Sequence, residues 1–350
     1  MSSPTRDRYA AAGVNLDTAE EAKRRIAELV RNTRTPLARG KVGSFGGMVR
    51  VPDGYKEPVL VMSTDGVGTK VLVAAAANVH DTVGEDLVNH SVNDILVHGA
   101  TPIAFLDYIA TGTLVPEIAA QIVAGVVRGC RAHDMTLAGG ETAQLPDLYA
   151  PGHYDLAGAI VGVVEEEQAI HGDRVTPGDQ LIGYASTGLH TNGYTLARKI
   201  VFEWLKLGID DPFPETGQTV AQVLLAVHRS YAATLRPVLS RVHALAHITG
   251  GGIPGNLGRV LPPGTEAVID AGGWPWPPLF RVLMRGGQLS RDEMRRVFNL
   301  GIGMIAVLGR DDVEAAMRAA ERTNVATWII GEIRAASRKP NAPAVRFEER

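Results

Sequence analysis

The sequence predicts an α/β or α+β fold built from two domains. Segments with helical and strand patterns alternate along most of the 350 residues, as expected for sheets covered by helices. The length suffices for two domains with large cores. A polar segment at 165–179, with Gly172, Pro177 and Gly178, separates one run of elements from the next. We therefore expect domains at 1–170 and 171–337 and a loose tail at 338–350.

Two kinds of hydrophobic pattern appear in the first half. Residues 17–20 read Asp-Thr-Ala-Glu, the form of a helix-capping box, and Ile26, Leu29 and Val30 continue it as an apolar helical face. Two further runs are helical in pattern, at 82–98 and 116–133. Three apolar runs are typical of strands, at 58–63, 103–110 and 154–164.

The second half begins a new cycle of strands and helices. Strands are expected at 180–185, 244–249, 266–270, 302–308 and 326–333. Helices are expected at 194–207 and 220–239, with another starting near Ile253.

Composition excludes several classes of protein. The formal net charge is −3 and aromatic residues make up 5% of the chain, which argues against a nucleic-acid or anionic-membrane partner. No apolar run approaches the roughly 20 residues of a membrane-spanning helix, and the N-terminus lacks the apolar stretch of a signal peptide. The single cysteine, Cys130, excludes an intrachain disulfide. We expect a cytoplasmic protein.

The segment Asp65-Gly66-Val67-Gly68-Thr69-Lys70 directly follows the strand expected at 58–63. A carboxylate at a strand end, followed by glycines and a lysine, suits a metal and phosphate site. Asp65 would bind Mg²⁺, and Lys70 with nearby backbone N–H groups would face phosphate oxygens. The spacing is not that of a Walker P-loop, and a structural turn is the alternative.

Two further acidic segments strengthen this prediction. Asn93-Asp94 lies in the helix expected at 82–98, where a solvated helix face is the alternative. Gly139-Gly140-Glu141-Thr142 follows an apolar stretch, so Glu141 is expected just after a strand. Together, Asp65, Asp94 and Glu141 offer the oxygen ligands that the cations accompanying ATP require.

Glycine-rich segments provide candidate loops. Ser44-Phe45-Gly46-Gly47 has the composition of a lid that closes over a ligand, or of a mobile loop without a role. In 186–193, His190 stands between a strand and a helix, placed for proton transfer or anion binding. His247-Ile248-Thr249-Gly250-Gly251-Gly252 precedes a helix and is a candidate phosphate cradle. We assign no role to the other eight histidines.

The ordered motifs resemble one known family. They are S-F-G-G (44–47), D-G-V-G-T-K (65–70), N-D (93–94), G-G-E-T-A (139–143), S-T-G-L-H-T-N-G-Y (186–194), H-I-T-G-G-G (247–252) and F-N-L-G-I-G-M (298–304). This series resembles phosphoribosylformylglycinamidine cyclo-ligase, also called AIR synthetase, from about residue 9 to 333. Tyr9 and Ala12-Gly13-Val14 look like that family's opening. Gln144 departs from the glutamate common in the family, so it receives no metal role.

The resemblance implies an enzyme of purine synthesis. Its fold has two domains: an N-terminal mixed-sheet domain that forms a homodimer interface and an ATP site, and a C-terminal α/β sandwich domain. Its activity closes formylglycinamidine ribonucleotide to aminoimidazole ribonucleotide, using ATP and Mg²⁺.

Carried onto this chain, the resemblance gives each motif a role. Asp65, Asp94 and Glu141 would hold Mg²⁺–ATP, and His190, Lys70, Asp65 and Asp94 would be the catalytic group. Residues around the nucleotide would be Gly66, Gly68, Thr69, Lys70, Asn93, Gly139, Gly140 and Thr142. Residues around the substrate would be Ser44, Phe45, Gly46, Gly47, Asn192, Thr249, Gly250, Gly251 and Gly252.

Related proteins provide the alternatives. Selenophosphate synthetase, thiamine-phosphate kinase and the hydrogenase-maturation dehydratase share the acidic ATP half. The reactive cysteine near the N-terminus of the first and the C-terminal cysteine of the last do not occur here. A binding protein without activity that kept this fold would have lost charged site residues, whereas Asp65, Lys70, Asp94, Glu141 and His190 are all present.

Overall fold

The computed structural model describes residues 15–336 and 344–349. Its described residues divide into two compact units, one formed by 15–53, 62–91 and 102–161, the other by 54–61, 92–101, 162–336 and 344–349. Short segments from the first half thus join the second unit. One reason is a pair of hydrogen bonds in which the backbone N–H groups of Lys56 and Glu57 donate to Glu165, at 2.8 and 2.7 Å. The opening residues Tyr9 and Ala12–Val14 lie outside the described residues.

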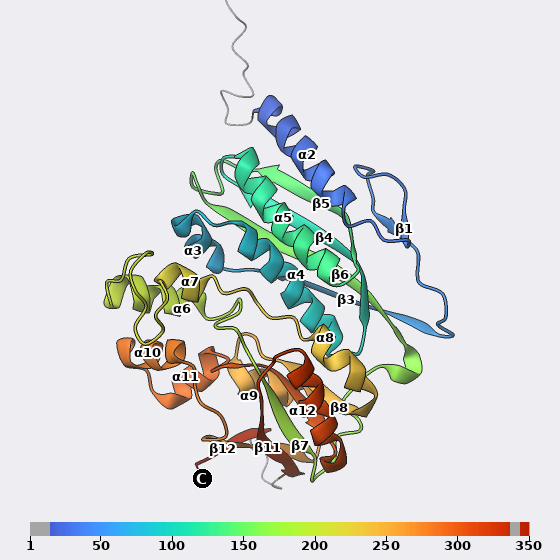
Figure 1. Cartoon of the computed structure of the whole chain (residues 1–350), viewed down its shortest axis with the longest axis vertical. Helices are drawn as coiled ribbons and strands as arrows, with labels where there is room; N and C mark the ends of the chain where they lie inside the picture. Colours follow the sequence, from blue (N-terminus) through green and yellow to red (C-terminus); the bar gives the residue numbers. More distant parts are fainter. Residues whose placement is uncertain (1–14, 337–343, 350) are drawn as a thin grey trace, which may run out of the picture. The chain divides into compact units, whose positions relative to one another are not determined.

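A four-stranded sheet forms the centre of the first unit. Its strand order is β3 (Pro58–Gly66), β6 (Tyr154–Glu165), β4 (Thr101–Thr111), β5 (Thr136–Gln144). The helices α4 (Asp81–Leu96) and α5 (Pro116–Ala132) cover one face of it (Figure 1). β4 and β5 are parallel, and α5 is the crossover that parallel neighbours require. The expected strands and helices of this half are confirmed.

Two smaller helices complete the first unit. α3 (Lys70–Ala77) follows β3 directly, and α2 (Leu16–Arg31) packs on α5 through Ala22 and Ala119. The capping box expected at Asp17 is wrong. The helix is capped two residues earlier, because the side chain of Asn15 accepts the backbone N–H of Thr18.

The position of Glu141 differs from the prediction, since β5 continues through it to Gln144. The two glycines before Glu141 do not end the strand. A Cβ on Gly140 would lie 2.0 Å from Oδ1 of Asp107 on the neighbouring strand β4. Gly140 therefore serves a close approach to the Asp107 side chain rather than a turn.

A six-stranded sheet forms the centre of the second unit, in the order β12-β9-β11-β7-β10-β8. Every neighbouring pair is antiparallel except β12 with β9, which is parallel. All seven residues of β10 are buried. The five strands expected in this half are confirmed as β7 (Gln180–Ala185), β8 (Val242–His247), β9 (Thr265–Asp270), β10 (Ile302–Leu308) and β11 (Thr327–Ala335).

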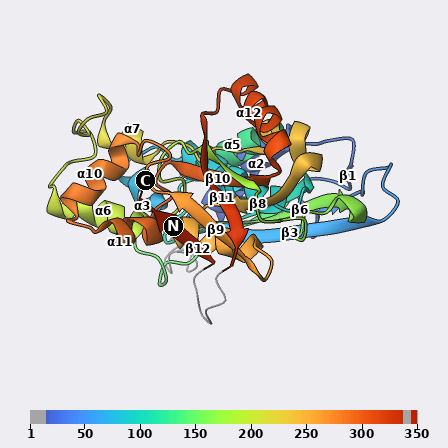
Figure 2. The ribbon, with the colours of Figure 1, turned by 90° about the horizontal axis from the view of Figure 1, so that it is seen from below.

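The loose tail expected at 338–350 is wrong for its last part. Val345–Glu348 form β12, which lies alongside β9 (Figure 2). Val345 is buried against the sheet. Apolar and charged residues alternate in Val-Arg-Phe-Glu, as is typical of a strand, but the run is short and its neighbours are charged.

The helices of the second unit are short. The helix expected at 194–207 is α6 (Tyr194–Arg198) followed by the π-helix η2 (Lys199–Trp204). The start near Ile253 is confirmed by α9 (Gly252–Leu257). Sequence reasoning did not single out α10 (Pro278–Gly286), α11 (Arg291–Val297) or α12 (Val313–Arg322). Among the described residues, no helix has the length and apolar character needed to cross a membrane.

The single helix expected at 220–239 is wrong. Its place is taken by α7 (Val220–Leu224), α8 (Ala232–Leu235) and the 3₁₀ helix η3 (Arg236–Arg241), with an extended segment at 226–230. Backbone groups of that segment bond outside any helix. The carbonyl of Val227 accepts from Thr187, and that of Arg229 accepts from Asn93. These partners compensate for the missing helical hydrogen bonds. The irregular segment also contains His228, which is buried.

Candidate functional site

His190 occupies a strained position in the loop between β7 and α6. Its φ is 62°, in the left-handed region that residues other than glycine seldom adopt. The side chain is buried, and its Nε2 accepts the backbone N–H of Thr187 at 3.2 Å. An accepting Nε2 carries no proton, so the neutral ring holds its proton on Nδ1. The loop thus fixes both the direction and the tautomer of His190.

Asn93, near the C-terminal end of α4, has its amide orientation fixed by the backbone. The N–H of Tyr231 donates to Oδ1 of Asn93 at 2.9 Å, which assigns that atom as the oxygen. Nδ2 then donates to the carbonyl of Arg229 at 2.8 Å and to Nε2 of His228 at 3.2 Å. Asn93 is fully buried, so the alternative of a solvated helix face is wrong.

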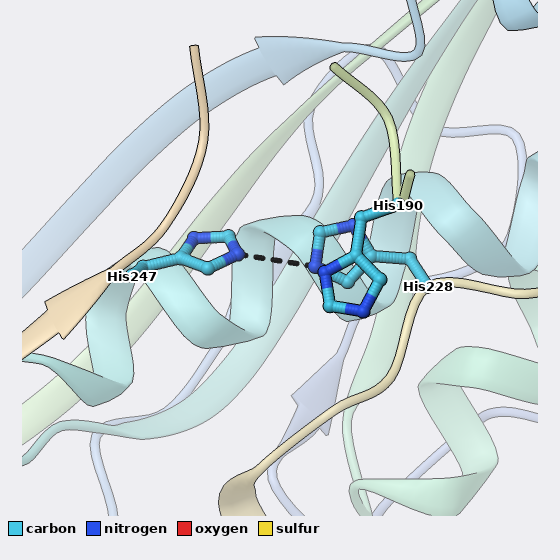
Figure 3. A group of neighbouring side chains, drawn as sticks. All are labelled: His190, His228 and His247. Atoms are coloured by element: carbon cyan, nitrogen blue, oxygen red, sulfur yellow. Dashed lines mark hydrogen bonds between the residues drawn. The ribbon is translucent and has the colours of Figure 1, made fainter. Parts of the chain in front are cut away.

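His247, at the end of β8, connects Asp94 with His228. Its Nδ1 lies 2.8 Å from Oδ1 of Asp94, and its Nε2 lies 3.0 Å from Nε2 of His228 (Figure 3). Because Nε2 of His228 already accepts from Asn93, it also accepts here, and Nε2 of His247 donates. One proton additionally lies between His247 and the Asp94 carboxyl, since an imidazole nitrogen and a carboxylate oxygen at this distance share one.

The ring of His228 also supports the His190 loop. The two imidazoles stack with centroids 3.9 Å apart and planes 21° from parallel, and Nδ1 of His228 lies 3.3 Å from Oγ1 of Thr191. Ring nitrogens of His190, His228 and His247 lie within 4.8 Å of one another, a spacing that a metal ion can bridge. Stacked rings direct their lone pairs side by side rather than toward one point, so the geometry favours a hydrogen-bonded array.

The F-N-L-G-I-G-M segment (298–304) also contacts the loop that carries His190. Nδ2 of Asn299 donates to the carbonyl of Gly188 at 2.9 Å, and Oγ of Ser186 lies 3.2 Å from Oδ1 of Asn299. A Cβ on Gly303 would lie 2.4 Å from Cε1 of His190 and 2.2 Å from the hydroxyl of Tyr231. Glycine at 303 is therefore a condition for the observed position of His190.

The candidate phosphate segment 249–252 lies beside Asn192. A Cβ on Gly250 would stand 3.3 Å from Oδ1 of Asn192. Gly251 and Gly252 have φ values of 92° and 62°, conformations that favour glycine. The amide of Asn256 donates to the carbonyl oxygens of Thr249, Gly250 and Gly252, which fixes the turn.

Asp65 lies at the end of β3, as predicted. Its Oδ2 stands 2.7 Å from Nε2 of the buried His90 on α4, and its Oδ1 accepts the N–H of Gly66. The carboxylate is 46% exposed, so it has both an orienting partner and access to solvent. Sequence analysis assigned no role to His90, and the structure places its ring against this carboxylate.

Lys70 is placed differently from an exposed phosphate ligand. It is fully buried at the start of α3, and its Nζ lies 2.7 Å from Oδ2 of Asp86, which is also fully buried. Burial lowers the pKa of Lys70 from its usual value, and Asp86 opposes that change. In this structure the ammonium contacts a carboxylate, and contact with a phosphate stays a prediction. Gly68, with φ 62°, and Thr69, at the helix N-cap, link Asp65 to Lys70.

Glu141 is not brought beside Asp65. β3 and β5 stand at opposite edges of the four-stranded sheet, roughly 14 Å apart at the usual strand spacing. The register pairs Glu141 with Tyr108 and pairs Gly140 with Asp107. Glu141 therefore shares the face of Tyr108, which is opposite to that of Asp107. Asp65 and Glu141 therefore stand apart within this unit.

The loop with Ser44-Phe45-Gly46-Gly47 connects two short strands, β1 (Ala38–Arg39) and β2 (Met48–Val49). Phe45 is fully exposed, while a Cβ on Gly47 would lie 2.6 Å from the carbonyl oxygen of Ala138 in β5. The loop therefore packs closely against β5 at Gly47, and its Phe45 side chain is exposed to solvent.

Within the second unit, then, Asn93, Asp94, His190, Asn192 and Gly250 are brought into one neighbourhood around His228 and His247. Sequence reasoning missed His228, His90, Asp86, Asp107 and Asn256. Each stands inside an apolar or helical pattern, and a single sequence gives no signal that separates such a residue from an ordinary buried polar group.

Comparison with known proteins identifies the class to which this fold and site belong. A model of the AIR synthase related protein N-terminal domain matches residues 46–164, and one of the C-terminal domain matches residues 176–339. Among solved structures, thiamine-monophosphate kinase from Stenotrophomonas maltophilia K279a has a TM-score of 0.67 at 18% identity, covering 93% of this chain and 96% of that one. The hydrogenase maturation protein HypE in complex with ATP has a TM-score of 0.62 at 19% identity, covering 92% and 89%. The chain has the fold of the AIR synthase-related proteins.

Relatives with high sequence identity show which family within this class the chain belongs to. Phosphoribosylformylglycinamidine cyclo-ligase of Sorangium cellulosum is 45% identical over 98% of both chains. The protein of the same name from Trichlorobacter lovleyi is 44% identical over 99% of both. That from Coxiella burnetii is 46% identical over 94% of this chain and 93% of its own. The chain belongs to the phosphoribosylformylglycinamidine cyclo-ligase family, whose members are ligases.

Proposed function

We propose that the chain catalyses the ATP-dependent closure of formylglycinamidine ribonucleotide to aminoimidazole ribonucleotide, with release of ADP and phosphate. The full-length similarity to cyclo-ligases carries this proposal. It is supported by the contacts that bring together three of the predicted motifs: hydrogen bonds link Asp94, His247 and His228, and the ring of His190 stacks on that of His228. The cytoplasm stays the predicted location.

The reaction needs a good leaving group on the formyl carbon, and it needs the two reacting ends of the substrate to be held close together. ATP transfers its terminal phosphoryl group to the formyl oxygen of the substrate, which turns a poor leaving group into a good one. The amidine nitrogen attacks the same carbon, and the C–O bond breaks as phosphate leaves and the imidazole ring closes. Holding the two ends of the substrate together lowers the entropic part of the barrier.

His190 is the proposed group for proton transfer or charge stabilisation in ring closure. Its Nε2 accepts from Thr187, so the neutral ring carries its proton on Nδ1. Asn192 beside it would position the substrate, and 249–252 would hold the ribose phosphate. Ser44 to Gly47 would close over the substrate, with Phe45 at the open part of the loop.

ATP and Mg²⁺ are proposed at the acidic motifs. Asp65 and Glu141 present exposed carboxylates, and Asp94 presents one already oriented by His247. These hard oxygen donors fit Mg²⁺, which would neutralise phosphate charge when bound. Gly66, Gly68 and Thr69 would lie along the phosphates, as would Gly139, Gly140 and Thr142 beside Glu141.

A homodimer is proposed through the uncovered face of the four-stranded sheet. That face carries Met62, 69% exposed, and Leu106 and Tyr108, each 39% exposed. They alternate with Asp65, which contacts α4, and with Phe105, which is buried under it. An apolar sheet face of this kind is typical of an interface.

The test measures ADP and the diazotisable aminoimidazole product after incubation with MgATP and formylglycinamidine ribonucleotide. Equal amounts of both products are expected from the wild type. Asp65→Asn should reduce turnover by roughly 100-fold or more, whereas Asp147→Asn, an exposed carboxylate without a proposed role, should not. ADP formed without aminoimidazole, or ADP formed instead with thiamine phosphate, would show a different phosphotransferase. Folded protein that forms neither product would refute the proposal.

A further inference from the structure

His228 contacts three motifs that are far apart in sequence. It accepts from Asn93 of α4 at 3.2 Å, lies 3.0 Å from His247 of β8, and stacks on His190 with Thr191 beside its Nδ1. The side chain is fully buried. Any buried histidine needs partners for its ring nitrogens, and those of His228 belong to three separate motifs.

The hydrogen bonds around His228 have one consistent direction. The N–H of Tyr231 fixes the Asn93 amide, whose NH₂ group faces Nε2 of His228. Nε2 is therefore an acceptor, and Nδ1 carries the proton toward Oγ1 of Thr191. As an acceptor, Nε2 also determines that His247 points its own Nε2–H inward.

We propose that His228 is a positioning residue of the ring-closure site, which holds His247 through its Nε2 and carries His190 on its ring face. This inference rests on the function proposed above. His190 has a strained backbone, its ring stacks on that of His228, and a Cβ on Gly303 would stand 2.4 Å from its Cε1. Loss of the His228 contacts would let His190 and His247 move, and a shift of about 1 Å in such groups can cost 100-fold in rate.

Two substitutions separate the ring contact from the hydrogen bonds. His228→Phe keeps a flat ring against His190 but removes both nitrogens. His228→Gln loses the stacking ring but restores an acceptor near the place of Nε2. His243→Phe is the matched control, because His243 lies on the same strand as His247 and pairs with Asp179 instead.

The expected result is a split between kcat and KM. His228→Phe should lower kcat by about 100-fold while KM for ATP and substrate changes little. His228→Gln should recover at least a tenth of the wild-type kcat, and His243→Phe should keep the wild-type kcat. Wild-type kcat in His228→Phe, a Gln variant no better than the Phe variant, or an equal loss in His243→Phe would each overturn the proposal.

A spectroscopic measurement on the wild-type protein tests the proposal even if the His228 variants do not fold. ¹⁵N-labelled histidine in the wild-type protein should show His228 as the neutral Nδ1–H tautomer, with Nε2 unprotonated. The opposite tautomer would overturn the proposal whether or not activity is found. Absence of ring closure in the wild type, with this tautomer present, would refute the proposed function and leave the array intact. Tight Zn²⁺ uptake that His228→Phe abolishes would show a metal site and overturn the positioning role.

Discussion

Gly303 lies so close to His190 that a Cβ at position 303 would stand 2.4 Å from Cε1 of the imidazole. β10 is fully buried and pairs with β7 on one side and β8 on the other, so its backbone has little room to retreat. The position of His190 is therefore set partly by the absence of a side chain on a neighbouring strand.

Gly303→Ala should displace His190 and Tyr231 together. Overpacking of this kind costs about 1–3 kcal/mol of stability, and the displaced ring should lower kcat by roughly 100-fold. Denaturant unfolding and steady-state kinetics measure both effects. Gly309→Ala is the control, since its Cβ would meet a neighbour at an ordinary 3.8 Å. A Gly303→Ala enzyme with full kcat would show that His190 is not held from this side.

Asp86→Asn should be strongly destabilising. It leaves the buried ammonium of Lys70 without its carboxylate, and breaking such a pair costs about 3–5 kcal/mol. The double variant Lys70→Met, Asp86→Leu should recover most of that loss, because neither charge remains. Urea unfolding measures the difference, with Glu314→Gln, half of an exposed pair, as the control. If Asp86→Asn lowers the unfolding free energy by less than about 1 kcal/mol, the pair is solvated or has another charged partner.

Asp107 should make stability depend on pH. Burial raises the pKa of its carboxyl to about 7 in the folded protein, above its unfolded value, so the folded state binds the proton more tightly. Its contribution is therefore favourable at low pH and falls as pH rises from about 4 to about 7. Asp107→Asn should have little effect near pH 5 and should stabilise the protein near pH 8. Unfolding free energies that change equally with pH in both proteins would contradict this assignment.

Met62→Glu should separate the proposed dimer. A charge on the uncovered sheet face opposes burial of that face against a second copy. Size-exclusion chromatography with light scattering should give a dimer for the wild type and a monomer for the variant. Leu148→Glu, at an exposed residue outside the sheet, should stay dimeric. A monomeric wild type would refute the dimer.

Strands and long helices could be predicted from the sequence because their signals are local. The runs of β7 and β10 carry the complete apolar pattern of buried strands, and both predicted ranges are confirmed. The segment 220–239 failed because side chains from distant positions, Asn93 and Thr187, take over its backbone hydrogen bonds. No local pattern can show partners that lie 40 and 136 residues away in the sequence.

The candidate site was predictable to the extent that its residues stand in glycine-rich motifs. His190 and Asp65 were found in this way. His228 was not, since it lies in a run that resembles one face of an apolar helix. The partner of Lys70 also escaped prediction, because a lysine after a glycine-rich turn indicates a phosphate site as readily as an ion pair.

The central claim is that ATP activates the formyl oxygen for ring closure, and isotope transfer tests it most directly. Formylglycinamidine ribonucleotide labelled with ¹⁸O in the formyl group would be incubated with MgATP and the wild-type protein. One labelled oxygen should appear in inorganic phosphate for each aminoimidazole formed. Aminoimidazole formed with unlabelled phosphate, and the label released into water, would contradict it.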